Sequence, residues 1–115
     1  MTMRQKIFSA LATCQIITTW ASPGLVDKNT PKPFGIVVFE DEMQSVENSA
    51  GHFQTFTVWP YMEKGSFVDL DEAVEEIRAK LSGYEYEGTG KDFTDDDLEA
   101  ITKVMQFRIP FARRR

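Results

Sequence analysis

The sequence predicts a small α+β domain: a two-layer sandwich with a mainly antiparallel sheet and helices packed on one face. Its 115 residues are 42% apolar and 27% charged, the size and composition of a single soluble domain spanning residues 1–115. Residues 53–61 alternate as a strand with apolar groups on both sides, which indicates a central strand. A helical pattern follows directly, and a strand covered by its own following helix gives two layers.

The chain begins with a predicted amphipathic helix that runs to about Gln15. Thr2 and Gln5 have the spacing of a capping box. Cys14 falls on the apolar stripe of this helix, so we interpret it as a small buried hydrophobe rather than a thiolate nucleophile. Residues 22–24 form a predicted turn, residues 25–26 a short strand and residues 27–33 a polar loop.

Residues 34–40 are a near-continuous apolar run with β-branched residues, which predicts a second strand. The acidic stretch 41–52 shows neither helical nor strand periodicity. We interpret it as a long connection between two antiparallel strands, into which the strands could extend. A connection of this length is usually functional or partly disordered.

The central strand contains Trp59, which we expect in the core. The helix after it has an apolar stripe, a predicted capping box of Asp69 and Glu72, and a stop at Gly83. The residues of the stripe are Leu70, Ala73, Val74, Ile77 and Leu81.

The last third of the chain is harder to interpret. Residues 84–86 alternate like a short strand, and residues 87–97 predict a mobile acidic loop. Residues 95–104 fit either a helix or a strand, although the β-branched content favours a strand over residues 102–109. Residues 112–115 form a basic tail.

Composition limits the classes of function. A formal net charge of −5 disfavours general binding to DNA, RNA or anionic membranes. One cysteine excludes an internal disulfide and fits a reducing compartment. No apolar run approaches the length of a membrane span.

Catalytic and metal-binding patterns are absent from the sequence. The only histidine, His52, has no nucleophile elbow to serve, and we favour a structural or exposed role for it. The acidic runs 41–42 and 95–97 lack the spacing of an EF-hand, so we interpret them as solvated loop charge. We therefore predict no enzyme, no cofactor and no metal.

As a whole the chain resembles the tail-completion or tail-terminator proteins of long-tailed bacteriophages. The features that carry the resemblance are the order and spacing of several short segments over nearly all of the chain. These segments are RQKIFSAL, Pro23-Gly24-Leu25-Val26, Pro33 followed by FGIVVFE, FQTFTVWPY, EAVEEIRAKLSG and VMQFRIPF. The acidic residues 92–97 depart from the common pattern.

The resemblance implies a structural protein of the virion, made in the host cytoplasm and placed at the head-proximal end of the tail. Its subunits would form a ring, commonly a hexamer, that caps the tail tube and docks beneath the head connector. The implied partners are further copies of the chain, the tail tube protein and a head-completion protein. DNA would pass through without specific binding, and we expect acidic groups to face the lumen.

Ring subunits meet through two different patches, so we look for complementary charges. The acidic candidates lie in the long connection, and the basic ones lie in the polar loop and the tail. These candidate subunit contacts are Asp41, Glu42, Glu47, Lys28, Lys32, Arg113, Arg114 and Arg115. Two alternatives stay open: a small cytoplasmic interaction or regulatory domain such as an inhibitor, and a small enzyme that uses His52.

Overall fold

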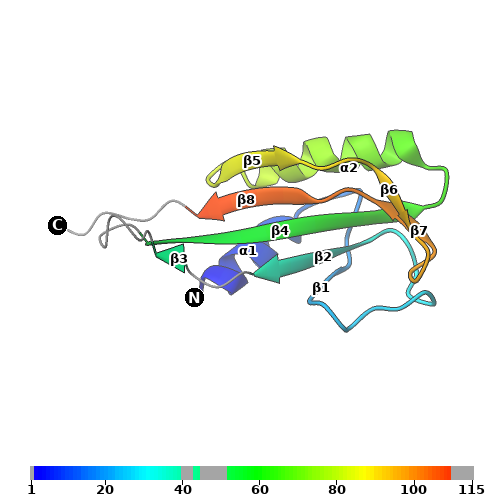
Figure 1. Ribbon diagram of the computed structural model, residues 1–115, viewed down its shortest axis with the longest axis horizontal. Helices are drawn as coiled ribbons and strands as arrows, with labels where there is room; N and C mark the ends of the chain where they lie inside the picture. Colours follow the sequence, from blue (N-terminus) through cyan, green and yellow to red (C-terminus); the bar gives the residue numbers. More distant parts are fainter. Residues whose placement is uncertain (1, 40–42, 45–51, 110–115) are drawn as a thin grey trace.

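The computed structural model describes residues 2–39, 43–44 and 52–109. For residues 43–44 and 52–54 it describes the backbone but not the side chains. Two helices and a mostly antiparallel sheet make up this part, which confirms the predicted α+β sandwich (Figure 1). The elements are α1 (Met3–Leu11), β1 (Trp20–Ala21), β2 (Phe34–Phe39), β3 (Met43–Gln44), β4 (His52–Glu63), α2 (Phe67–Lys80), β5 (Glu85–Thr89), β6 (Phe93–Asp95), β7 (Ala100–Thr102) and β8 (Met105–Ile109).

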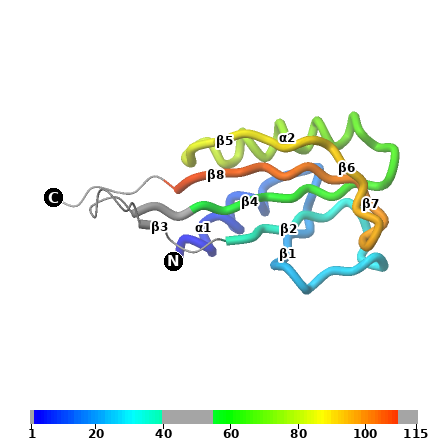
Figure 2. Tube along the Cα trace, viewed as in Figure 1, coloured from blue at the N-terminus to red at the C-terminus, as the bar shows by residue number. Residues whose placement is uncertain are grey.

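The sheet is built around β4, as predicted. β2 runs antiparallel along one edge of β4, and β8 and then β7 follow one another along the other edge. β5 pairs with β8, β6 pairs with β7, and β1 lies parallel to β2 at the opposite margin (Figure 2). The long central strand therefore joins every part of the sheet.

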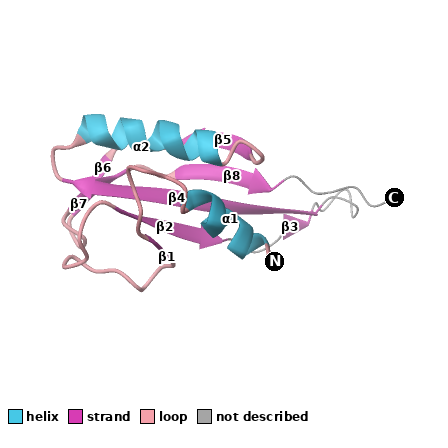
Figure 3. Cartoon of the chain, turned by 180° about the vertical axis from the view of Figure 1, so that it is seen from behind, coloured by secondary structure: helices cyan, strands magenta, loops and turns pink. Residues whose placement is uncertain are grey.

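Both helices pack on one face of the sheet. α1 passes behind the sheet in Figure 1 and in front of it in Figure 3. Apolar side chains of α1, α2 and the inward positions of β2, β4, β7 and β8 form this interlayer core. Its buried members include Ile7, Leu11, Val37, Phe56, Val58, Leu70, Ile77, Ile101, Met105 and Phe107.

β7 and β8 lie end to end along the same edge of β4, and the pairing with β4 is interrupted opposite Pro60. Thr102 pairs with Tyr61 and Met105 with Val58, so the register is the same on both sides of the break. Gly35, the partner of Pro60 on β2, donates its N–H to Thr19 and so away from β4. The backbone nitrogen and carbonyl of Pro60 therefore point toward the break between β7 and β8. Proline has no N–H to donate there.

The start of the chain is partly as predicted. The capping box is confirmed, because Thr2 Oγ1 accepts from Gln5 N at 3.1 Å and Gln5 Oε1 accepts from Thr2 N at 2.8 Å. The helix ends at Leu11 rather than near Gln15. The backbone N–H of Gln15 donates instead to the Glu76 carboxylate of α2.

Two further expectations were wrong in detail. The short strand is Trp20–Ala21 rather than residues 25–26, and Leu25 is 75% exposed. α2 begins at Phe67 after Ser66, so Asp69 and Glu72 lie inside the helix and form no capping box. Asp69 is in the first turn, where a negative charge is favourable next to the helix dipole.

The two predicted connections contain strands. Residues 87–97 hold the end of β5 and all of β6, because their neighbours β8 and β7 offer backbone partners. Within the long connection, β3 pairs with the first residues of β4. The predicted strand 102–109 corresponds to β8 and the last residue of β7.

Candidate functional site

The helix-free face of the sheet carries a shallow apolar groove of about 410 Å³. This face is turned toward the viewer in Figure 1. β2 and β4 form the floor of the groove, and β6 and the loop after β1 form its sides. The lining residues are Pro23, Ile36, Val38, Trp59, Tyr61, Phe93 and Asp95.

Strand alternation and aromatic stacking build the groove. Ile36 lies opposite Trp59 across the β2–β4 pair, so both side chains fall on the same face. The rings of Trp59 and Phe93 meet edge to face with centroids 6.1 Å apart. The Trp59 Nε1–H donates to Thr57 Oγ1 at 2.9 Å, which satisfies the polar atom of the indole within its own strand.

One polar pair fixes an end of the groove. The Tyr61 hydroxyl donates to Asp95 Oδ2 at 3.3 Å, and Asp95 Oδ1 accepts from the backbone N–H of Leu98. Burial, and then the charge of Asp95, raise the pKa of Tyr61 to about 12. Tyr61 is therefore a protonated donor at neutral pH, and Asp95 holds the β6–β7 turn in place.

The chain on both sides of Asp95, which lines the groove, is acidic, and we call this segment the acidic rim. Its members are the carboxylates of residues 92–99: Asp92, Asp95, Asp96, Asp97 and Glu99. Asp92 pairs with Lys103 at 2.9 Å and Asp96 with Lys64 at 3.9 Å. Among the described residues, none pairs with the exposed side chains of Asp97 and Glu99. Lys103 also pairs with Asp71 of α2 at 3.5 Å, so two ammonium groups serve these five carboxylates and Asp71, and negative charge is in excess.

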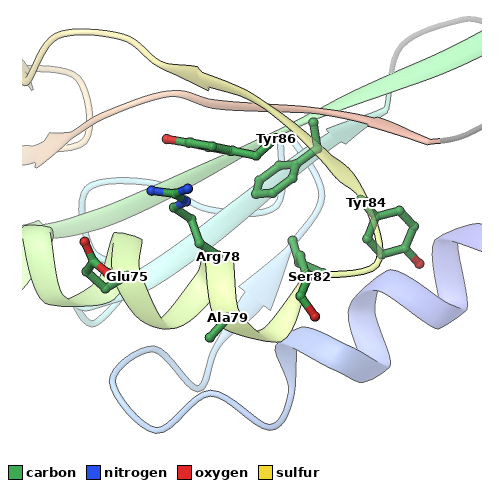
Figure 4. Close-up of a pocket in the computed structure, with 8 residues that line it drawn as sticks. Glu75, Arg78, Ala79, Ser82, Tyr84 and Tyr86 are labelled. Atoms are coloured by element: carbon green, nitrogen blue, oxygen red, sulfur yellow. The ribbon is translucent and has the colours of Figure 1, made fainter.

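A second pocket, of about 470 Å³, lies between the C-terminal half of α2 and β5 (Figure 4). The Arg78 guanidinium lies over the Tyr86 ring, 4.2 Å from its centroid, and takes up one wall of the pocket. Ser82 also lines it, but within the described part of the chain its hydroxyl has no hydrogen-bonded base. This pocket therefore contains an arginine stacked on a tyrosine ring, but its serine has no general base among the described residues to activate it.

The predicted contact residues are only partly placed by the structure. Lys28 is exposed and Lys32 is half-buried in the β1–β2 loop, where Lys32 Nζ donates to the Lys28 carbonyl at 3.3 Å. The remaining candidates lie outside the described residues: Asp41, Glu42, Glu47, Arg113, Arg114 and Arg115. The structure therefore brings together the two lysines alone.

Among the residues that could have a catalytic or metal-binding role, the structure places Cys14 but not the side chain of His52. Cys14 is buried, as predicted, and burial followed by the nearby charge of Glu76 raises the pKa of its thiol to about 11. His52 begins β4, but its side chain lies outside the described residues. Within residues 2–39, 43–44 and 52–109, no group of three His, Cys, Asp or Glu is placed to hold a metal ion. No helix there is long and apolar enough to cross a membrane.

The groove was missed by sequence reasoning because its two walls are far apart in the chain. Trp59 was expected in the core, whereas it is only half-buried and faces the groove. Comparison of the chain with protein-family models and with curated proteins found no match.

Proposed function

We propose that this chain is a structural subunit of a phage tail, which closes the head-proximal end of the tail tube as a ring and joins the tail to the head. The observation that carries the proposal is the open sheet face, with its aromatic groove and acidic rim. Apolar concavities bordered by polar residues are typical of protein–protein contact sites. The order of segments along the chain, which resembles tail-completion proteins, supports the same function.

The charge of the chain suits a channel for DNA. Each subunit carries a formal net charge of −5, so a ring of six concentrates negative charge around its axis. We place acidic groups at the lumen, where they keep a passing genome from adhering. A ring structure whose lumen is lined by lysine and arginine would overturn this orientation.

The proposal is tested by mass and by electron microscopy. The full chain is measured by native mass spectrometry, alone and mixed with tail tubes of the phage whose genes flank it. We expect a ring-sized oligomer seated at one end of each tube. Chain that stays unattached, or that coats the tube along its length, contradicts the proposal.

The groove also favours a second function, a small interaction domain unrelated to virions that docks a partner on the same face. Neighbouring genes separate the two functions. Capsid and tube genes beside this one favour the tail subunit, and their absence favours the interaction domain.

A further inference from the structure

We propose that the groove is the receptor for the C-terminal segment of a neighbouring copy of the chain, residues 110–115. In this contact Phe111 enters the aromatic groove, and Arg113, Arg114 and Arg115 lie along the acidic rim. The inference rests on the self-assembly in the proposed function and names the surfaces that make it. It differs from the contacts expected from the sequence, because it adds an apolar anchor to the charge pairing.

The chemistry of the segment matches the chemistry of the groove. The sequence PFARRR places one aromatic ring two residues before three guanidinium groups. The groove offers Trp59 and the half-exposed Phe93 as aromatic neighbours for a ring. The acidic rim begins at the same place, because Asp95 lines the groove and belongs to the rim. An aromatic anchor beside arginines is the composition that interface hot spots favour.

Several carboxylates of the acidic rim are available to pair with these arginines. Asp96 is held by Lys64 only at 3.9 Å, through side chains that are 88% and 53% exposed. Asp97 and Glu99 are exposed and unpaired among the described residues. Guanidinium groups bind carboxylates through two parallel hydrogen bonds, which gives this contact direction as well as charge.

Chain length decides that the donor of the segment is another copy. Phe111 follows Ile109 by two residues, so its Cα lies at most about 7 Å beyond the end of β8. Ile109 pairs with Gln54, whereas Trp59 lies five residues further along β4. That separation is about 17 Å along a strand. Phe93 is more distant still, because it lies opposite Thr102, the partner of Tyr61. The Phe111 of the same chain therefore cannot reach the aromatic part of the groove, between Trp59 and Phe93.

Groove and segment are different patches, so the contact is head-to-tail. Each copy offers one segment and one groove, and a contact of this kind closes into a ring when the rotation between copies allows it. Phe93 and Asp95 place one side of the groove at β6. β6 lies at one end of the molecule, and β8 ends toward the other (Figure 1). Donor and receptor are thus well separated on each subunit.

A peptide experiment tests the groove without requiring a ring. The receptor is the full-length chain with Phe111→Ser, Arg113→Ser, Arg114→Ser and Arg115→Ser, and the probe is the peptide IPFARRR. Calorimetry should give one peptide per chain, with binding that weakens about tenfold or more when NaCl rises from about 0.05 to about 0.5 M. The peptide IPSARRR should bind about tenfold more weakly, because the apolar anchor is lost.

Two receptor variants locate the binding site, each added to this receptor. Phe93→Ser removes an aromatic wall, and Asp97→Lys reverses an exposed rim charge; each should weaken binding about tenfold. Glu72→Lys is the matched control, because Glu72 is exposed on α2 and the change in charge is identical. Circular dichroism checks the fold, and Asp97→Lys keeps the test valid if Phe93→Ser unfolds the chain. Equal binding by all three variants, or no binding, overturns the inference.

A mixing experiment then tests the arrangement in the assembled state. One full-length chain carries the serine substitutions in residues 111–115, and the other carries Phe93→Ser with Asp97→Lys. If the contact is head-to-tail, each is monomeric alone, and their mixture stops at a one-to-one dimer in native mass spectrometry. Rings formed by either variant alone on tail tubes would overturn the groove contact and leave the tail function standing. Binding of the peptide to the groove without any ring on tail tubes would support the groove contact and overturn the tail function.

Discussion

At the scale of single residues, Glu76 connects the two helices. Its carboxylate accepts the backbone N–H of Gln15 at 2.8 Å and that of Ile16 at 3.0 Å, just after α1 ends. These donors have no place in the helix, so one side chain satisfies two backbone groups at once. The sharp exit from α1 depends on a residue sixty positions away, which no local pattern could reveal.

We predict that Glu76→Ala lowers the free energy of unfolding by about 2–3 kcal/mol, because two charge-assisted hydrogen bonds are lost. Urea unfolding followed by circular dichroism measures the change. Glu72→Ala, a change on the exposed face of the same helix, should cost less than about 0.5 kcal/mol. Equal effects of the two substitutions would show that Glu76 acts only through helix propensity.

Cys14 gives a chemical prediction. Its pKa of about 11, against an ordinary 9.0, leaves about one hundredth of the usual thiolate at pH 8. Alkylation of the folded chain by iodoacetamide should therefore be at least about 100-fold slower than alkylation in urea, with burial slowing it further. Folded protein that reacts as fast as unfolded protein would contradict the burial of this thiol.

The same group sets an alkaline limit to stability. The unfolded thiol begins to ionise near pH 9.0, whereas the folded thiol keeps its proton to about 11. The unfolded state binds fewer protons in this window, so stability falls as pH rises through it. The melting temperature should decline from pH 9 to pH 11, and less steeply in Cys14→Ala. Tyr61 adds a decline above its ordinary pKa of 10.0, because its folded pKa is about 12.

At the scale of elements, the β1–β2 pair depends on a glycine. A Cβ at Gly35 would clash with the ring of Trp20, which lies against this backbone. Gly35→Ala should therefore cost more than about 2 kcal/mol, measured by urea unfolding. In a Trp20→Ala background the same substitution should cost much less, because the clash is gone. Additive costs would exclude the contact.

The periodicity of apolar residues predicted the elements that bury one face. It did not predict the strands that form because a neighbouring strand supplies their backbone hydrogen bonds. The stripe from Leu70 to Leu81 identified α2, but its start was missed, since Ser66 makes no side-chain cap bond and Val68 is 70% exposed. The end of β5 and the whole of β6 were predicted as a loop, because their backbone partners are supplied by strands elsewhere in the chain.

The groove could not be predicted from sequence for a related reason. Ile36 and Trp59 meet through the register of two strands, and Phe93 reaches them from a third strand. The charge of residues 92–99 was visible in the sequence, but its place beside an aromatic surface was not. Of the predicted contact residues, only Lys28 and Lys32 lie within the described part of the chain.

At the scale of the whole molecule, the proposed assembly can be separated from the stability of the fold. The buried residues of the described interlayer core lie outside residues 40–51, where β3 pairs only with the first residues of β4. We predict that deletion of residues 40–51 leaves a folded chain that no longer closes into a ring, although its groove still binds the C-terminal segment of a neighbouring copy. Circular dichroism and native mass spectrometry measure the two outcomes. Rings formed by the shortened chain would show that the long connection is not an interface.

The two tryptophans lie on opposite faces of the sheet: Trp20 packs with the helices, whereas Trp59 lines the groove. Their fluorescence therefore reports on different events. In a Trp20→Phe chain the remaining emission comes from an indole that a subunit docked in the proposed way would cover, so its wavelength and its quenching by iodide test that contact. In a Trp59→Phe chain the remaining emission follows only the integrity of the fold, which gives each titration its own internal reference.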